Sequence, residues 1–116
     1  MSWFKRSARQ KDSQSGPERA SQSLTRRQTI EHLQGFVETR VSVEAYIEPP
    51  NKDFQTTLLL IATTGEWTRR KVPDAKVARQ IAAQLAIPVY DVNFTGYPQR
   101  MRDWNAAQRA KNKATS

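Results

Sequence analysis

The chain has 116 residues, of which 37% are hydrophobic, and this is enough for one domain with a modest core but not for two domains. It contains no cysteine and one histidine, which excludes disulfides and thiolate metal sites and makes a structural zinc site untenable. The longest apolar run, LLLIA at 58–62, is far shorter than the roughly 20 residues that span a bilayer, and the N-terminus lacks the apolar stretch of a signal peptide. We therefore expect a soluble, cytoplasmic protein.

The net charge of +8 is concentrated at the two ends of the chain. Residues 1–22 carry five basic and two acidic groups (+3), and residues 97–116 carry five and one (+4), so the ends hold seven of the eight excess charges. A basic surplus of this kind attracts anions such as phosphates, or holds the protein near an anionic membrane surface. The alternative, that basic ends only keep the chain soluble, stays open.

The first 22 residues are polar and rich in Ser and Gln, a composition that predicts a disordered basic tail. Trp3 and Phe4 beside two cations could touch a lipid interface, but an interfacial anchor needs a longer amphipathic face or a second signal, so we do not expect membrane association. From Ser23 the pattern changes, and we assign residues 23–113 to a single domain that ends in a basic helix.

The elements follow in order along this domain. Apolar residues at steps of three and four predict a helix over about 25–38, and period-2 alternation predicts a strand over 41–48 with Val41, Val43, Ala45 and Ile47 buried. A run that is apolar at successive positions predicts a central strand over 56–63. The turn at Thr64 and Gly65 leads into a third strand over 66–72.

Pro73 and Asp74 then predict the start of a second helix, because proline fits the first turn and a carboxylate opposes the positive end of the helix dipole. Pro88 stops this helix and begins a fourth strand over 89–94, which its proline places at an edge of the sheet. A last helix follows Gly96. The order α-β-β-β-α-β-α predicts an α+β fold with a small, mostly antiparallel four-stranded sheet packed with helices.

The last helix combines apolar and basic residues. On a helical wheel Met101 and Trp104 fall on one side, which predicts that they dock on the sheet, while Arg102, Arg109 and Lys113 align on another side. We interpret these three cations as candidates for nucleic-acid binding.

The hairpin GEWTRRKV forms a second basic cluster. Strand alternation places Trp67, Arg69 and Lys71 on one face and Arg70 on the other, so Trp67 could stack bases beside cations or could simply cover the sheet. Lys76 and Arg79 on the next helix would extend this patch. The complete set of candidate nucleic-acid-binding residues is Trp67, Arg69, Arg70, Lys71, Lys76, Arg79, Arg102, Arg109 and Lys113.

Two resemblances bear on the chain. The segment RRKVPDAKVARQIAAQLA after three strands resembles, in topology, a double-stranded RNA-binding domain, although Pro73 and Asp74 stand where that family has lysines. The runs VEAYIEPP, GEWTRR and IPVYDVNFTGYPQRMRDW resemble a family of small basic actinobacterial proteins of uncharacterised function, over roughly residues 25–110. Neither resemblance implies a catalytic residue.

The sequence offers few residues from which a catalytic site could be built. The four glycines are scattered, so neither a dinucleotide-binding turn nor a P-loop is present, and we expect no cofactor and no metal. A restriction-endonuclease-like nuclease shares the element order, but the central strand has no carboxylate and Thr68 stands where a lysine is needed. Asp91 is interpreted as a structural group that forms a hydrogen bond or an ion pair with an arginine.

The sequence therefore favours a non-enzymatic module that binds nucleic acid, most plausibly structured RNA. The alternative is a protein-interaction adaptor with Tyr46, Trp67, Tyr97 and Trp104 in an exposed patch. An enzyme with an unrecognised site is a third possibility.

Overall fold

The computed structural model describes the backbone of residues 17–115 and the side chains of residues 25–114. The chain divides into two compact units, Met1–Glu31 and His32–Ser116, and helix α1 (Pro17–Thr39) runs through the boundary between them. The helix begins eight residues before the predicted position 25, inside the segment that was predicted to be disordered; residues 1–16 of that segment lie outside the described residues. Gly35 does not interrupt the helix, as expected for a single glycine that costs about 1 kcal/mol.

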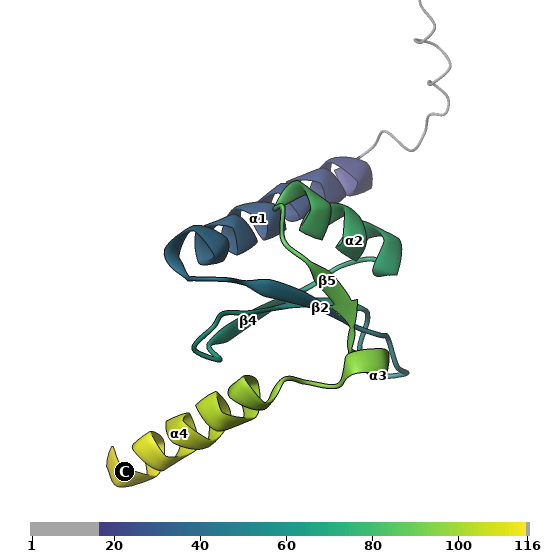
Figure 1. The fold of residues 1–116 in the computed structure, drawn as a ribbon. Helices are drawn as coiled ribbons and strands as arrows, with labels where there is room; N and C mark the ends of the chain where they lie inside the picture. Colours follow the sequence, from purple (N-terminus) through teal and green to yellow (C-terminus); the bar gives the residue numbers. More distant parts are fainter. Residues whose placement is uncertain (1–16, 116) are drawn as a thin grey trace, which may run out of the picture. The chain divides into compact units, whose positions relative to one another are not determined.

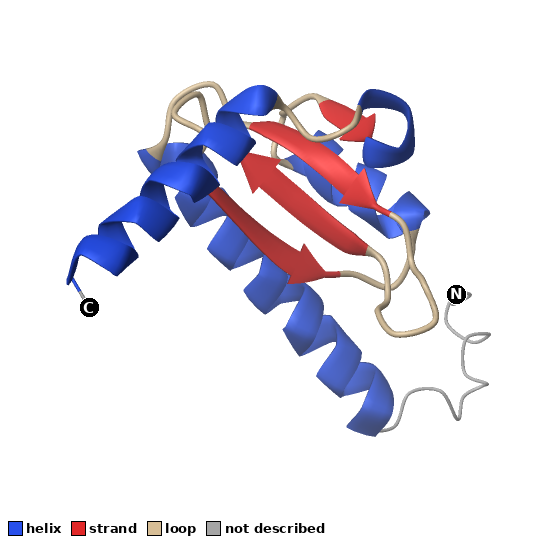
Figure 2. Cartoon of the chain, turned by 90° about the horizontal axis from the view of Figure 1, so that it is seen from below, coloured by secondary structure: helices blue, strands red, loops and turns tan. Residues whose placement is uncertain are grey.

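The second unit is built on a four-stranded sheet in the order β4-β3-β2-β5. Its strands are β2 (Glu44–Glu48), β3 (Thr57–Ile61), β4 (Trp67–Lys71) and β5 (Val89–Asp91). The predicted α+β class and element order are confirmed. Strand β3 is central and β5 lies at an edge, also as predicted (Figures 1 and 2).

The sheet is mixed, which corrects the prediction of a mostly antiparallel sheet. Strands β2, β3 and β4 are antiparallel neighbours, whereas β5 is parallel to β2. The reason is the helix α2 (Ala75–Gln84) between β4 and β5, which carries the chain back to the end of the sheet where β4 began. A crossover of this kind makes the next strand parallel.

One face of the sheet, here called the aliphatic face, is covered by α2 and by residues 32–39 of α1 (Figure 1). The strand register places on it Ala45, Ile47, Leu58, Leu60, Thr68 and Arg70. Leu33 of α1 and Ile81 of α2 are buried against this layer. Helix α2 begins at Ala75, with Asp74 as the N-cap whose carboxylate accepts a hydrogen bond of 2.9 Å from the Val77 N–H, so Pro73 lies before the helix and not in its first turn as predicted.

The opposite face, here called the ionic face, is covered by the first turns of helix α4 (Gln99–Thr115). The register places on it Glu44, Tyr46, Glu48, Thr57, Leu59, Ile61, Trp67, Arg69 and Lys71. Met101 of α4 packs with Tyr46, Leu59 and Ile61. Tyr46 is therefore only 6% exposed, although strand alternation alone placed it on the side away from the buried residues.

All four strands are shorter than predicted; β2 loses residues at its start and β5 at its end. Ser42 has a positive φ of 51°, so regular pairing starts only at Glu44, and Val41 is 73% exposed instead of buried. Strand β5 ends at Asp91, whose carboxylate accepts a hydrogen bond from the Asn93 N–H and caps the short helix α3 (Val92–Thr95). This confirms the structural hydrogen bond expected for Asp91.

None of the helices within residues 17–115 has both the length and the apolar character that crossing a bilayer requires.

Candidate nucleic-acid interface

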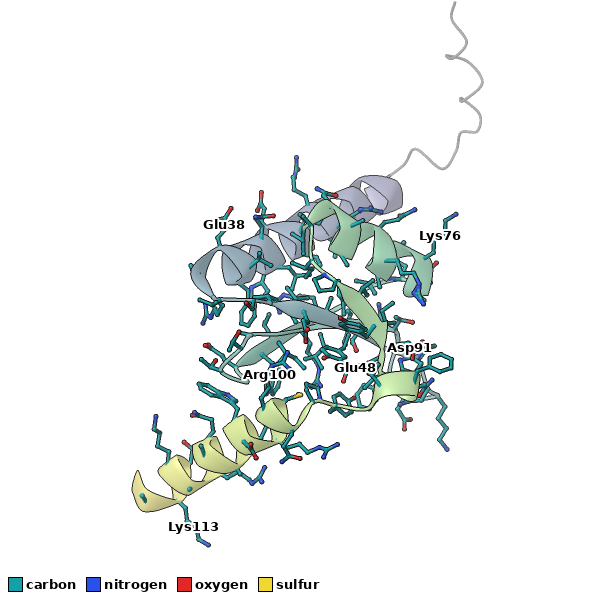
Figure 3. All side chains as sticks on the ribbon, viewed as in Figure 1. Glu38, Glu48, Lys76, Asp91, Arg100 and Lys113 are labelled. Atoms are coloured by element: carbon teal, nitrogen blue, oxygen red, sulfur yellow. The ribbon has the colours of Figure 1, made fainter. Side chains whose placement is uncertain are left out.

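Helix α4 is anchored to the ionic face by Arg100. Its Nε donates to the backbone oxygen of Ala62 at 2.9 Å, and its Nη2 donates to Glu44 at 2.7 Å. The Tyr46 hydroxyl donates to the same carboxylate at 3.1 Å. Arg100 therefore holds the first turn of α4 between strand β2 and the end of β3 (Figure 3).

Glu48 is the second anchor, at the other end of β2. Its carboxylate accepts hydrogen bonds from Thr57 Oγ1 (2.6 Å), from Arg69 (3.0 and 2.8 Å) and from the Tyr97 hydroxyl (2.6 Å). Burial alone would raise the pKa of Glu48, but these hydrogen bonds and the Arg69 charge outweigh it and lower the pKa below its ordinary value. Burial and the neighbouring carboxylate raise the pKa of Tyr97 to about 12. Glu48 is thus ionised at neutral pH and fixes the chain just before α4.

Gly65 allows α4 to lie close to the turn between β3 and β4. It has a positive φ of 94°, and a Cβ placed on it would lie 2.1 Å from the Arg100 carbonyl oxygen. No other residue fits both the backbone conformation and this approach. The start of α4 is therefore held against the turn by backbone contact as well as by side chains.

Trp67 is partly buried and is held by two neighbouring side chains. Its Nε1 donates to Asn105 of α4 at 2.8 Å, and the Arg69 guanidinium lies 4.7 Å from the ring centroid. Arg69 is at the same time ion-paired with Glu48. Of the two interpretations of Trp67, base stacking or covering the sheet, the geometry matches covering the sheet. Arg69 takes part in the same packing, because it lies over the Trp67 ring and pairs with Glu48.

The outward line of α4 consists of Arg102, Arg109 and Lys113. All three are exposed, and they lie within about 40° of one another on the helical wheel, roughly 130° from the side that docks. Arg102 donates to Gln99 and to the Tyr97 backbone oxygen, both at 3.1 Å. In Figures 1 and 2 the second half of α4 extends beyond the sheet.

The remaining predicted cations do not join this line. Arg70 faces the aliphatic side, where its Nη2 lies 3.2 Å from Nδ1 of His32. Lys76 and Arg79 belong to α2, across the sheet from α4, and Figure 3 shows Lys76 and Lys113 on opposite sides of the sheet. Lys71 is exposed on the ionic face. The nine predicted residues therefore do not form one plane, and α4 holds three of them together.

Sequence reasoning missed the partners of the basic residues. Glu44 and Glu48, which hold Arg100 and Arg69, both lie on the ionic face of β2, and their period-2 spacing was a signal that this face needed basic partners. Both ring nitrogens of His32 have partners. Arg70 can only donate, so Nδ1 accepts from it and Nε2–H donates to Thr68 Oγ1 at 2.7 Å. Burial lowers the pKa of His32, and the Arg70 charge lowers it further.

A separate group of exposed rings lies away from the basic helix. Phe94 of α3 is 89% exposed and Phe54, in the loop after β2, is 64% exposed. Tyr90 of β5 is also exposed and stacks at an angle on Tyr46, with 5.4 Å between ring centroids. Strands β2 and β5 are parallel, so the loop after β2 and α3 after β5 both leave from one end of the sheet. We call Phe54, Tyr90 and Phe94 the ring corner.

Within the side chains described, no group of three or more His, Asp or Glu residues could hold a metal ion. No protein family, curated protein or solved structure matches the chain.

Proposed function

We propose that this protein is a non-enzymatic module that binds nucleic acid, structured RNA in particular, and that α4 is its contact element. The observation that carries the proposal is the outward line: Arg102, Arg109 and Lys113 share one side of a helix whose first turns are fixed to the sheet. Phosphates make most of the contacts in such complexes, and they are met by arginine and lysine.

The spacing along α4 supports this use. With a rise of about 1.5 Å per residue, Arg102 and Arg109 are about 10 Å apart along the axis and Arg109 and Lys113 about 6 Å apart. Arg109 makes no side-chain hydrogen bond or ion pair within residues 25–114. The one acidic residue of α4, Asp103, accepts a hydrogen bond from Gln99 at 3.0 Å.

The test is a variant that removes the outward line: Arg102→Gln, Arg109→Gln and Lys113→Gln together. Binding to a hairpin RNA is measured by fluorescence anisotropy between about 50 and 300 mM salt. We expect weaker binding and a log–log salt slope that is less negative by about 2 to 3, because each phosphate contact contributes about 0.9.

The matched control removes the same charge elsewhere: Lys52→Gln, Lys76→Gln and Arg79→Gln. All three cations are exposed, one in the loop after β2 and two on α2. The control is expected to keep a slope within about 1 of the native protein. An equal loss in both variants would mean that diffuse charge, not α4, carries the binding, and no RNA retention at about 50 mM salt would end the proposal.

A second candidate, a protein-interaction adaptor, is supported by the ring corner. The patch first considered for this role is interrupted, because Tyr46 is buried and Trp67 is partly buried, although Tyr97 is 37% exposed. Phe94 is the better anchor: α3 has no buried residue, so it presents this ring to solvent. Exposed aromatic rings of this kind dominate many protein interfaces.

The two candidates are separated by a pair of variants. A partner held by the ring corner would survive nuclease and about 0.5 M salt, because apolar contacts are not screened. It would be lost with Phe54→Ser and Phe94→Ser together and retained by the outward-line variant. The opposite pattern supports nucleic-acid binding.

A further inference from the structure

We infer that the outer edge of strand β4 binds an extended, acidic segment of another protein, which adds to the sheet as a further strand. This inference goes beyond the proposed function, because it concerns a different surface and a protein partner instead of a nucleic acid. It rests on the backbone groups that β4 directs away from β3 and on the charges beside them.

Strand β4 is the last strand on its side of the sheet (Figure 2). Where it begins, the Ala62 N–H donates to the Glu66 backbone oxygen at 2.9 Å, and where it ends, the Val72 N–H donates to the Thr56 oxygen, also at 2.9 Å. Hydrogen bonds in an antiparallel pair recur at every second residue, so the even-numbered residues of β4 bond to β3. The N–H and C=O groups of the odd-numbered residues point away from β3; these residues are Trp67, Arg69 and Lys71.

The groups that point outward form no hydrogen bond within residues 25–114. A row of free donors and acceptors of this kind is a template on which an extended segment can pair through its own backbone. The edge of β4 therefore offers the hydrogen bonds that an added strand needs.

The charges along this edge are basic on both sides of the sheet. Arg69, Arg70 and Lys71 are exposed, and Arg69 is ion-paired with Glu48. Neither Arg70 nor Lys71 forms an ion pair with a carboxylate among the described side chains. Arg70 lies on the aliphatic face and Lys71 on the ionic face, because successive side chains of a strand alternate. Two adjacent acidic residues in an added strand would therefore each meet a cation, one on each face.

Charge also distinguishes between the possible occupants of the edge. Pairing of β4 with the same strand of a second copy would bring arginine and lysine side chains opposite one another, and like charges directly opposite are destabilising. Basic residues on an edge strand protect a protein against such self-pairing. Residues 1–22 of the chain have a net charge of +3, so charge does not favour them either. An acidic segment of another protein is the occupant whose charge is complementary to the edge.

The first experiment measures binding of labelled peptides to the full chain by fluorescence anisotropy at about 50 mM salt. The acidic probe is SVTEEVTS, and SVTKKVTS is its basic counterpart. Two further forms of the acidic probe are N-methylated on one or the other set of alternate residues. We expect the basic probe and one of the methylated forms to bind at least about 10-fold more weakly than the acidic probe, and the other methylated form to bind like it, because only every second peptide N–H faces β4. Equal binding of the two methylated forms would show attraction by charge alone and would overturn the inference.

Amide hydrogen exchange followed by NMR locates the bound peptide. In the free protein we expect the outward amides of Trp67, Arg69 and Lys71 to exchange faster than those of Thr68 and Arg70, which bond to β3. The acidic probe should slow the three outward amides by about 10-fold or more. Slowing of these amides by a hairpin RNA and not by the peptide would contradict a protein partner.

The charge contribution is tested with Arg70→Glu and Lys71→Glu together, which should weaken binding of the acidic probe by about 10-fold or more. The matched control is Lys52→Glu with Lys76→Glu, two exposed cations away from β4, and should change it by about twofold at most. An equal loss in the two variants, or no binding of the acidic probe to the native protein, would overturn the inference. Either result leaves the proposed function standing, because that function rests on α4.

Discussion

The two faces of the sheet are built differently, although residues of the same strands supply both. The aliphatic face is closed by leucine, isoleucine and alanine side chains under α2 and the end of α1. The ionic face adds two carboxylates, Glu44 and Glu48, which bind Arg100, Arg69 and Tyr97. Apolar burial is non-directional, whereas hydrogen-bonded charges fix position. The aliphatic face therefore provides stability, and the ionic face determines where α4 lies.

The largest expected effect is on the aliphatic face. Leu60→Ala removes a fully buried side chain at the centre of β3, and we expect a loss of about 3 kcal/mol in the free energy of unfolding, from lost burial and the cavity left behind. Denaturant unfolding measures it. A loss below about 1 kcal/mol would mean that this face is not the main source of stability.

The next effect tests how closely α4 approaches the sheet. Gly65→Ala adds a Cβ against the backbone of Arg100 at a positive φ, and we expect a loss of about 2 to 3 kcal/mol with faster hydrogen exchange in the first turn of α4. Gly96→Ala is the control, because its φ is also positive, at 69°, but nothing lies within 4 Å of the added Cβ. Equal losses would show that backbone strain alone accounts for the effect and that α4 does not press on the turn.

Substitution of Glu48 should have a smaller, pH-dependent effect on the free energy of unfolding. The pKa of Glu48 is lower in the folded protein, so its contribution is complete above the ordinary value of 4.5 and is lost as the pH falls through the folded-state pKa. Glu48→Gln should cost about 2 kcal/mol at pH 7 and progressively less as the pH falls below 4.5. The hydrogen bond from Arg40 lowers the pKa of Glu66 as well, so some acid dependence remains in the variant. Unfolding curves at pH 7 and at a series of pH values below 4.5 measure the difference, and a cost that stays constant over the whole acid range in which the protein remains folded would contradict this account of Glu48.

The smallest effect on stability is expected for the outward-line variant. Its three side chains are exposed, and such substitutions change the free energy of unfolding by at most about 0.5 kcal/mol. Thermal unfolding measures this. A larger loss would mean that these cations help to hold α4 in place.

The sequence predicted local patterns better than partners. Apolar periodicity located the central strand and the buried side of α2, and the alignment of Arg102, Arg109 and Lys113 on one side follows from helix geometry. The sequence did not show which basic residues form ion pairs within the fold. Arg100 binds Glu44, 56 positions away, and Arg69 binds Glu48, 21 positions away. Those pairs depend on strand register and on the side of the sheet that α4 covers. The parallel pairing of β5 was missed for the same reason.

The central claim is that α4 divides its arginines between holding the helix and binding phosphate. The most direct measurement is the RNA salt slope and the free energy of unfolding for two single variants, Arg100→Gln and Arg109→Gln. We predict that Arg100→Gln lowers stability by about 1 to 2 kcal/mol because it breaks two hydrogen bonds, one of them to a carboxylate. Arg109→Gln should leave stability unchanged and reduce the slope by about 1. Stability lost with Arg109→Gln, or a slope unchanged by it, would contradict the claim.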